Sequence, residues 1–203
     1  MPRTNLSADE SRQLILDEAE RLFRTLGYAK TTIGDIAEAC GFSPSNVHKH
    51  FGTKAAVNEA CAERMLRMKD ETARIAARKE ASAADKLRAY LTSLNETTKR
   101  LLISEKRVHE MVLYAIDERW EVVAQFRERM QRDIEDIIRG GMESGEFTGN
   151  NASKTARQVF SASAKLLHPI MVAESEEFSA EGVAEELIEF LIEALTSSKR
   201  TTH

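Results

Sequence analysis

The chain has 203 residues and a mass of 22.8 kDa, which suits one globular domain or a small domain joined to a larger one. Apolar residues make up 42% and charged residues 31%, which argues against a disordered chain, and the lack of a long apolar run argues against a transmembrane helix. Two cysteines, Cys40 and Cys61, are too few for a disulfide framework or a cysteine-rich zinc site. We therefore expect a reduced, cytoplasmic protein without a membrane segment.

The net charge of −4 is unevenly distributed along the chain. Between Arg21 and Lys54, five lysines and arginines stand against Asp35 and Glu38, whereas residues 55–203 carry 22 cations and 26 anions. Charge close to a contact governs the attraction to phosphate, because salt screens charges that lie farther away. The basic N-terminal segment is therefore compatible with nucleic-acid binding.

The N-terminal part of the chain predicts short helices separated by tight breaks. Apolar residues recur at helical spacing over residues 7–26, 33–39, 44–51 and 54–79. The expected N-terminal caps are Ser7 (in a capping box with Glu10), Thr31 or Thr32, Ser43 before Pro44, and Thr53. Glycines that end the first three helices are Gly27, Gly41 and Gly52.

The remainder of the chain also predicts helices, so the fold class is all-α. The expected ranges are 83–102, 105–116, 118–139, 152–173 and 179–196. Gly140 and Gly141 are expected to end the third of these helices, and Asn151 to cap the fourth after a loop that begins at Gly145. Pro169 should bend the fourth helix, because it removes one backbone N–H group.

Three residues between the second and third helices have the spacing of a helix-turn-helix motif. Ala37 is small where two helices approach closely, Gly41 can adopt the left-handed backbone of the turn, and Val47 is an apolar plug between the helices. In such motifs the second helix lies in the major groove of DNA. The spacing therefore predicts DNA binding by the helix over residues 44–51.

The polar residues around this motif are the candidate DNA contacts. Ser45, Asn46, His48, Lys49 and His50 lie on or near the outer face of the third helix and suit base edges or phosphates. Phosphate contacts are expected from residues at helix starts, where N–H groups point outward: Thr32, Ser43, Thr53 and Lys54. Thr32, Lys49 and Lys54 have no packing role that the sequence reveals, which favours DNA as their partner.

The run TTIGDIAEACGFSPSNVHKHFGTKAAV resembles the motif of the tetracycline-repressor (TetR) family. The matching positions are Thr31, Thr32, Ile36, Ala37, Gly41, Val47, His50, Phe51 and Lys54. His48 stands where the family mostly has a tyrosine that contacts a phosphate, and Val57 where it mostly has leucine. The resemblance is specific over residues 10–58; beyond them only helix content and length agree.

This resemblance implies a homodimeric transcriptional regulator, most often a repressor, that binds a palindromic operator in double-stranded DNA. It implies a DNA-binding domain over residues 1–54 and a helical domain over 55–203 that binds a small-molecule effector and dimerises through its last two helices, about 152–196. Binding of the effector would release the operator. The candidate effector contacts are Met111, Tyr114, Phe160 and His168; an ordinary core or a bent interface helix would explain the same residues.

Other classes of function find less support in the sequence. No nucleophile motif, phosphate-binding glycine loop or dinucleotide fingerprint is present, so we expect neither an enzyme nor a cofactor. His48 and His50 point to different helix faces and lack further ligands, which argues against a metal site. A protein-binding adaptor of the same fold that has lost DNA binding is the alternative, because the motif's core residues maintain the fold in either case.

Overall fold

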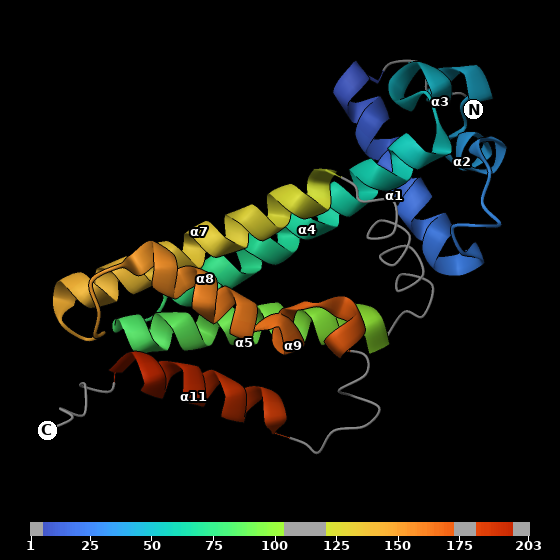
Figure 1. Cartoon of the computed structure of the whole chain (residues 1–203). Helices are drawn as coiled ribbons and strands as arrows, with labels where there is room; N and C mark the ends of the chain where they lie inside the picture. Colours follow the sequence, from blue (N-terminus) through green and yellow to red (C-terminus); the bar gives the residue numbers. More distant parts are fainter. Residues whose placement is uncertain (1–5, 104–120, 173–181, 197–203) are drawn as a thin grey trace, which may run out of the picture. The chain divides into compact units, whose positions relative to one another are not determined.

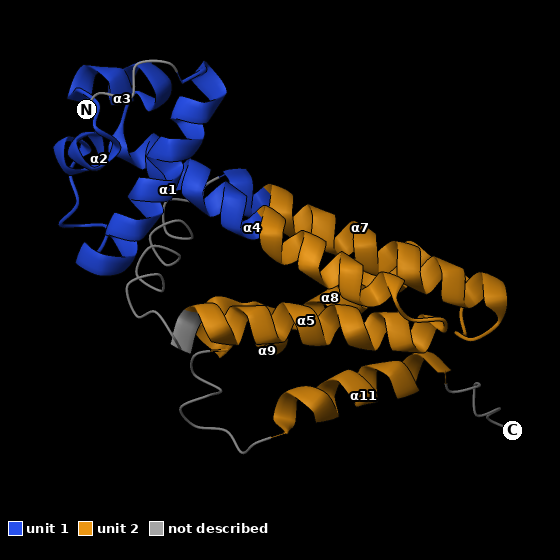
Figure 2. Cartoon of the chain, turned by 180° about the vertical axis from the view of Figure 1, so that it is seen from behind, with its two compact units in different colours: residues 1–66, 104–124 blue, residues 67–103, 125–203 orange. Residues whose placement is uncertain are grey.

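The computed structural model describes residues 6–103, 121–172 and 182–196, and all regular structure within these ranges is helical (Figure 1). The chain divides into two compact units (Figure 2). The head contains residues 1–66 and 104–124, and the body contains residues 67–103 and 125–203. The division between the units lies inside helix α4 (Lys54–Arg78), between Leu66 and Arg67.

The head consists of α1 (Ala8–Leu26), α2 (Ile33–Cys40), α3 (Pro44–Phe51) and the first turns of α4. The predicted caps are confirmed. Ser7, Thr32, Ser43 and Thr53 each accept a hydrogen bond from the backbone N–H three residues later. Each helix therefore begins where its own side-chain cap satisfies an N–H group that has no partner within the helix.

Apolar side chains from all four helices form the core of the head. Fully buried members include Ile15, Ala19, Ile36, Val47, Val57 and Cys61. Arg64 of α4 adds polar links to α1, because its guanidinium pairs with Asp17 at 2.6 Å and Glu20 at 2.9 Å. The first turns of α4 thus pack as part of the head, which explains why the division falls beyond residue 54.

The body contains the second half of α4 with α5 (Ala83–Ile103), α7 (Glu121–Ser144, from residue 125 on), α8 (Ala152–Ala162), α9 (Ala164–Leu167) and α11 (Val183–Thr196). The second half of α4 lies beside α7, and α11 lies beside α5 (Figure 1). The core of the body is apolar and includes Leu87, Leu91, Leu94, Ile134, Ile138 and Ile188.

The expected end of α7 at Gly140 and Gly141 is wrong. The helix continues to Ser144, and the loop begins only at Gly145. A Cβ at Gly141 would overlap the ring of Phe147 and would lie 2.8 Å from the Cβ of Ala83, whereas Gly140 faces open space. Gly141 is therefore explained by close packing against the following loop and α5.

The segment expected as one bent helix over 152–173 is broken twice. The first break is at Ser163, whose buried hydroxyl donates to the carbonyl of Val159, and it separates α8 from α9. The second is at His168, whose backbone is extended (φ −82°, ψ 123°), as expected for a residue that precedes proline. Asn95 of α5 donates to the carbonyl of Leu166 beside this second break.

The predicted helix over 105–116 lies outside the described residues, as does the start of the helix expected from residue 179. None of the helices described above combines the length and the apolar character that crossing a bilayer requires.

Candidate DNA-binding site

The turn between α2 and α3 has the geometry that the sequence motif predicts. Gly41 is left-handed (φ 70°, ψ 29°), and the N–H of Phe42 donates to the carbonyl of Ala37 at 2.8 Å. Ala37 and Val47 are almost completely buried between the two helices. These contacts hold α3 at a defined angle to α2, which positions its outer face.

The outer face of α3 carries polar residues without an acidic side chain. Ser45, His48 and Lys49 are exposed, while Asn46 and His50 are half-buried. The N-terminus of α3 is also accessible, because Ser43 is exposed; its hydroxyl lies 2.9 Å from that of Ser45. Three polar side chains, those of Ser45, His48 and Lys49, are therefore accessible to a ligand as large as a DNA duplex.

His48 is oriented by the end of its own helix. Its Nδ1 lies 2.6 Å from the carbonyl oxygen of Gly52, and this oxygen can only accept a hydrogen bond. Nδ1 therefore carries a proton, so the neutral ring presents Nε2 outward as an acceptor. An acceptor suits an exocyclic amino group on a base edge, whereas only the charged imidazolium could donate to a phosphate.

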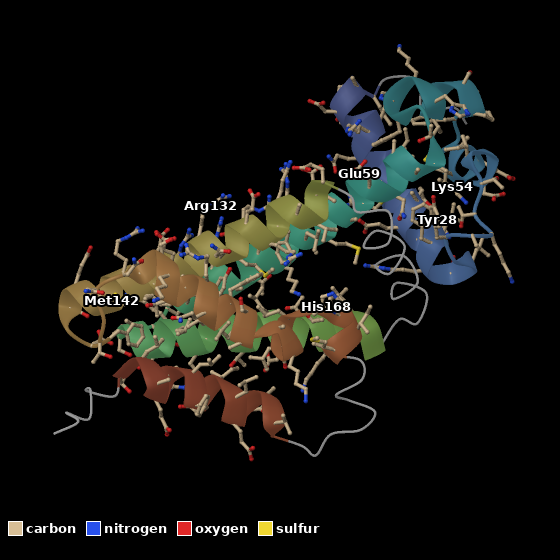
Figure 3. The ribbon with its side chains drawn as sticks, in the orientation of Figure 1. Tyr28, Lys54, Glu59, Arg132, Met142 and His168 are labelled. Atoms are coloured by element: carbon tan, nitrogen blue, oxygen red, sulfur yellow. The ribbon has the colours of Figure 1, made fainter. Side chains whose placement is uncertain are left out.

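Lys54 has a structural role that the sequence did not reveal. Its ammonium donates to the carbonyls of Tyr28 and Thr31, both at 2.9 Å, and lies 4.3 Å from the centre of the Tyr28 ring. Figure 3 shows Lys54 and Tyr28 next to each other in the head. The expectation that Lys54 has no packing role is wrong, because it joins the start of α4 to the loop between α1 and α2.

Thr32 and Thr53, the other expected phosphate contacts, differ in their surroundings. The Thr32 hydroxyl donates to Asp35, whose pKa is lowered by hydrogen bonds from the backbone and side chain of Thr32. An anion thus already occupies the N-terminus of α2, which disfavours a phosphate there. The first turn of α4 beside the exposed Thr53 has no acidic residue. Thr53 is therefore the better placed of the two.

Arg12 of α1 is a residue near the site that sequence reasoning missed. Its guanidinium lies 4.0 Å from the centre of the Phe51 ring and donates to the carbonyl of His50 at 3.1 Å. These two contacts stabilise the C-terminal end of α3. Its position outside the apolar stripe of α1 gave no signal of this contact.

The structure describes two of the four candidate effector contacts, Phe160 and His168. Met111 and Tyr114 lie outside the described residues. Phe160 on α8 is half-buried, and its ring centre lies 6.0 Å from the Arg127 guanidinium. His168 is exposed at the end of α9, within the body (Figure 3). Among the described side chains, no group of three His, Cys, Asp or Glu is placed to hold a metal ion.

Two family models match the chain. Residues 15–61 match the model "Bacterial regulatory proteins, tetR family", and residues 83–188 match "Tetracyclin repressor-like, C-terminal domain". The second match alone covers more than half of the chain.

Similar proteins agree with these matches. The HTH-type transcriptional regulator TtgR of Pseudomonas putida is 29% identical over 140 residues, which are 68% of this chain and 65% of TtgR. A transcriptional regulator from Cytophaga hutchinsonii has the same fold, with a TM-score of 0.69, 17% identity and coverage of 91% of this chain and 98% of that one. The structure of a SmeT–triclosan complex gives a TM-score of 0.65 at 18% identity, covering 93% of each chain. The chain belongs to the TetR family of transcriptional regulators.

Proposed function

We propose that the protein is a ligand-responsive regulator, most simply a repressor, that binds a palindromic DNA operator as a dimer and leaves it when a small molecule binds. The observation that carries the proposal is the pairing of the buried Ala37 and Val47 with the exposed Ser45, His48 and Lys49 on α3. The buried pair orients the helix, and the exposed residues have the donors and acceptors that base edges require.

The residues have different roles in this proposal. Ser45, Asn46 and His48 read bases in the major groove, and Lys49 adds a base or phosphate contact. Ser43 and Thr53 receive phosphates at the starts of α3 and α4, and His50 at the end of α3 adds a further phosphate contact. Lys54 and Thr32 act mainly inside the head, since their polar groups already bind carbonyls and Asp35 respectively.

Dimerisation through residues of about 152–196 is supported by apolar side chains that the subunit leaves exposed. Phe190 on α11 is 64% exposed, and Ile170 and Met171 are 40% and 42% exposed. Apolar side chains of this size are normally covered by a partner when they lie together on one face. Effector binding in the body is supported by the SmeT–triclosan complex, in which a protein of the same fold carries a small molecule.

The division of roles predicts different effects of two substitutions on DNA binding. Asn46→Ala should relax the preference at one base position at a cost of about 1–3 kcal/mol. Lys49→Ala should weaken binding to all sequences and lower the salt dependence of log K by about one unit if it contacts a phosphate. Fluorescence anisotropy on a set of single-base operator variants distinguishes them, and identical profiles for both variants would refute this assignment.

One observation is also compatible with the alternative function, a protein-binding adaptor that has lost DNA binding. Lys54 and Thr32 have partners within the head, so two of the three residues that favoured DNA also have structural reasons to be present. Lys49 remains exposed, and it is the residue whose substitution separates the two functions. An adaptor would show the same weak DNA binding with and without Lys49.

A further inference from the structure

Lys69 places an ammonium group inside the body. It lies on the second half of α4 and is only 6% exposed. Its Nζ donates to the hydroxyl of Thr98 on α5 at 2.5 Å and lies 5.5 Å from the centre of the Phe126 ring on α7. One turn away on each of these helices is a buried apolar residue: Ala73 on α4, Leu94 on α5 and Met130 on α7. The ammonium is thus surrounded by three mainly apolar helix faces.

No anion in the described part of the chain compensates this charge. None of the ion pairs among the described residues involves Lys69. Of these residues, only Thr98 accepts a hydrogen bond from the three N–H groups of the ammonium. Burial lowers the pKa of Lys69 to about 8, with no contribution from a nearby carboxylate. Near neutral pH most molecules therefore keep a positive charge in a site that water does not solvate.

The neighbouring charges are already paired with one another. Asp70 receives Arg129 at 3.2 Å and Arg74 at 3.6 Å, and Asp133 receives Arg74 at 2.9 Å and the hydroxyl of Tyr90 at 3.0 Å. These residues link α4, α5 and α7 without using Lys69, although Oδ1 of Asp70 has no hydrogen-bond partner among the described residues. The ion pairs of this cluster therefore do not include the Lys69 ammonium.

We propose that Lys69 is the anion-recognition point of the effector site, and that the effector is an amphipathic carboxylate whose apolar skeleton packs among α4, α5 and α7. The inference rests on the proposed function, because it assigns chemistry to an effector site in the body. A carboxylate would accept the remaining N–H groups of Lys69 and neutralise its charge, while the apolar faces would bind an aromatic or aliphatic skeleton. The adaptable side chain of Met130 suits either skeleton.

The test compares acids with their neutral isosteres on the full chain. Calorimetric titrations would use 2-naphthoate against 2-naphthamide for an aromatic skeleton, and decanoate against decanamide for an aliphatic one. We expect at least one acid to bind about tenfold or more tightly than its amide, as for a charge-assisted hydrogen bond in a buried site. Equal binding of acid and amide in both pairs, or no binding of either acid, overturns the proposal.

Two variants locate the preference. Lys69→Met should reduce the ratio of acid to amide affinity to about one, whereas Lys165→Met, which removes an exposed lysine of α9, should leave the ratio unchanged. A preference that persists in Lys69→Met overturns the assignment to Lys69. The wild type adds a readout that needs no variant: at about pH 8 the acid should bind with net proton uptake, because it favours the charged form of Lys69, and the amide should not. Lack of this uptake also contradicts the proposal.

A parallel titration with operator DNA separates this inference from the proposed function. If the wild type binds DNA and the acid does not release it, or binds no better than the amide, the effector assignment fails and the regulator remains. If the wild type prefers the acid but shows no specific DNA binding, the regulator proposal fails and the carboxylate site stands. Lys69→Met should still bind the operator and should no longer respond to the acid.

Discussion

Lys54 joins segments of the head that lie far apart in the sequence, and its substitution tests whether this role is structural. Lys54→Met removes two hydrogen bonds from a charged donor to the carbonyls of Tyr28 and Thr31. We expect the free energy of unfolding to fall by about 2 kcal/mol. Chemical denaturation monitored by circular dichroism measures this change.

Lys49→Met is the matched control, because Lys49 is exposed on α3. It should leave stability unchanged and weaken DNA binding. The opposite pattern, a stable Lys54→Met variant whose only defect is DNA affinity, would restore the phosphate role that the sequence suggested.

Lys69 should make stability depend on pH in the alkaline range. The pKa of Lys69 is about 8 in the folded protein and 10.5 without burial. Between these two pH values the unfolded chain therefore binds more protons than the folded chain does. Stability therefore rises with pH through this window, by up to about 3 kcal/mol for this group alone. The Lys69→Met variant should be more stable than the wild type at neutral pH, and its advantage should shrink as pH rises.

Cys61 has an opposing effect on the pH dependence of stability. This effect cancels when the wild type and Lys69→Met are compared at the same pH. Burial raises the pKa of this thiol to about 12 from 9.0, so its contribution to stability is lost as pH rises above about 9 in both proteins. Denaturant unfolding at several pH values measures the difference. A difference that does not change with pH would mean that burial does not lower the pKa of Lys69.

Individual side-chain roles were the least predictable from sequence. The caps were predicted because Ser7, Thr32, Ser43 and Thr53 bond to residues only three positions away. The role of Lys54 depends on carbonyls more than twenty positions earlier, and no local pattern indicates such a partner. Lys69 likewise resembles an ordinary surface lysine of a helix until the packing of α5 and α7 is known.

At the scale of elements, Gly140 and Gly141 form a matched pair. Gly141→Ala should lower the free energy of unfolding by about 1–3 kcal/mol, because its Cβ would overlap Phe147 and crowd Ala83. Gly140→Ala should raise the free energy of unfolding by about 0.5–1 kcal/mol, because alanine favours the helical backbone more than glycine does and the new methyl group meets open space. Thermal unfolding of both variants checks the prediction, and equal shifts would show that Gly141 is not held by close packing.

Helix starts were more predictable than helix ends. The starts of α1 to α4 follow from caps that bond within three residues, and α3 begins and ends as predicted at Pro44 and Phe51. The end of α7 and the break at Ser163 depend on contacts between elements, and two adjacent glycines resemble a stop when Phe147 is not in view. A bend at Pro169 was predicted because proline acts locally, and the structure has a break at His168, the residue that the proline restricts.

At the scale of the whole molecule, the proposed dimer makes Phe190 a decisive residue. Phe190→Ser should convert the dimer to a monomer, because it removes the largest exposed apolar side chain of α11. Met68→Ser is the control, since Met68 is 65% exposed on α4. Size-exclusion chromatography with light scattering gives the masses. A wild-type monomer, or a dimer that withstands Phe190→Ser and dissociates with Met68→Ser, would contradict the proposed interface.

The family and the helix-turn-helix were predictable because Ala37, Gly41 and Val47 act within one local motif, whereas the candidate effector contacts had no such motif. The four candidate contacts were chosen as aromatic, methionine or histidine residues at helical spacing, a pattern that ordinary core residues share. Lys69, the residue that we propose as the anion-recognition point, was not among them, although it is buried and has one hydrogen-bond acceptor among the described residues.

Specific DNA binding can be measured on the wild-type protein without any variant. Fluorescence anisotropy would compare binding to DNA that flanks the protein's own gene with binding to unrelated DNA of equal length at the same moderate salt concentration. We expect saturable binding to the flanking DNA that is at least about a thousandfold tighter than to the unrelated DNA. Equally weak binding to both would contradict it and would favour a protein-binding adaptor.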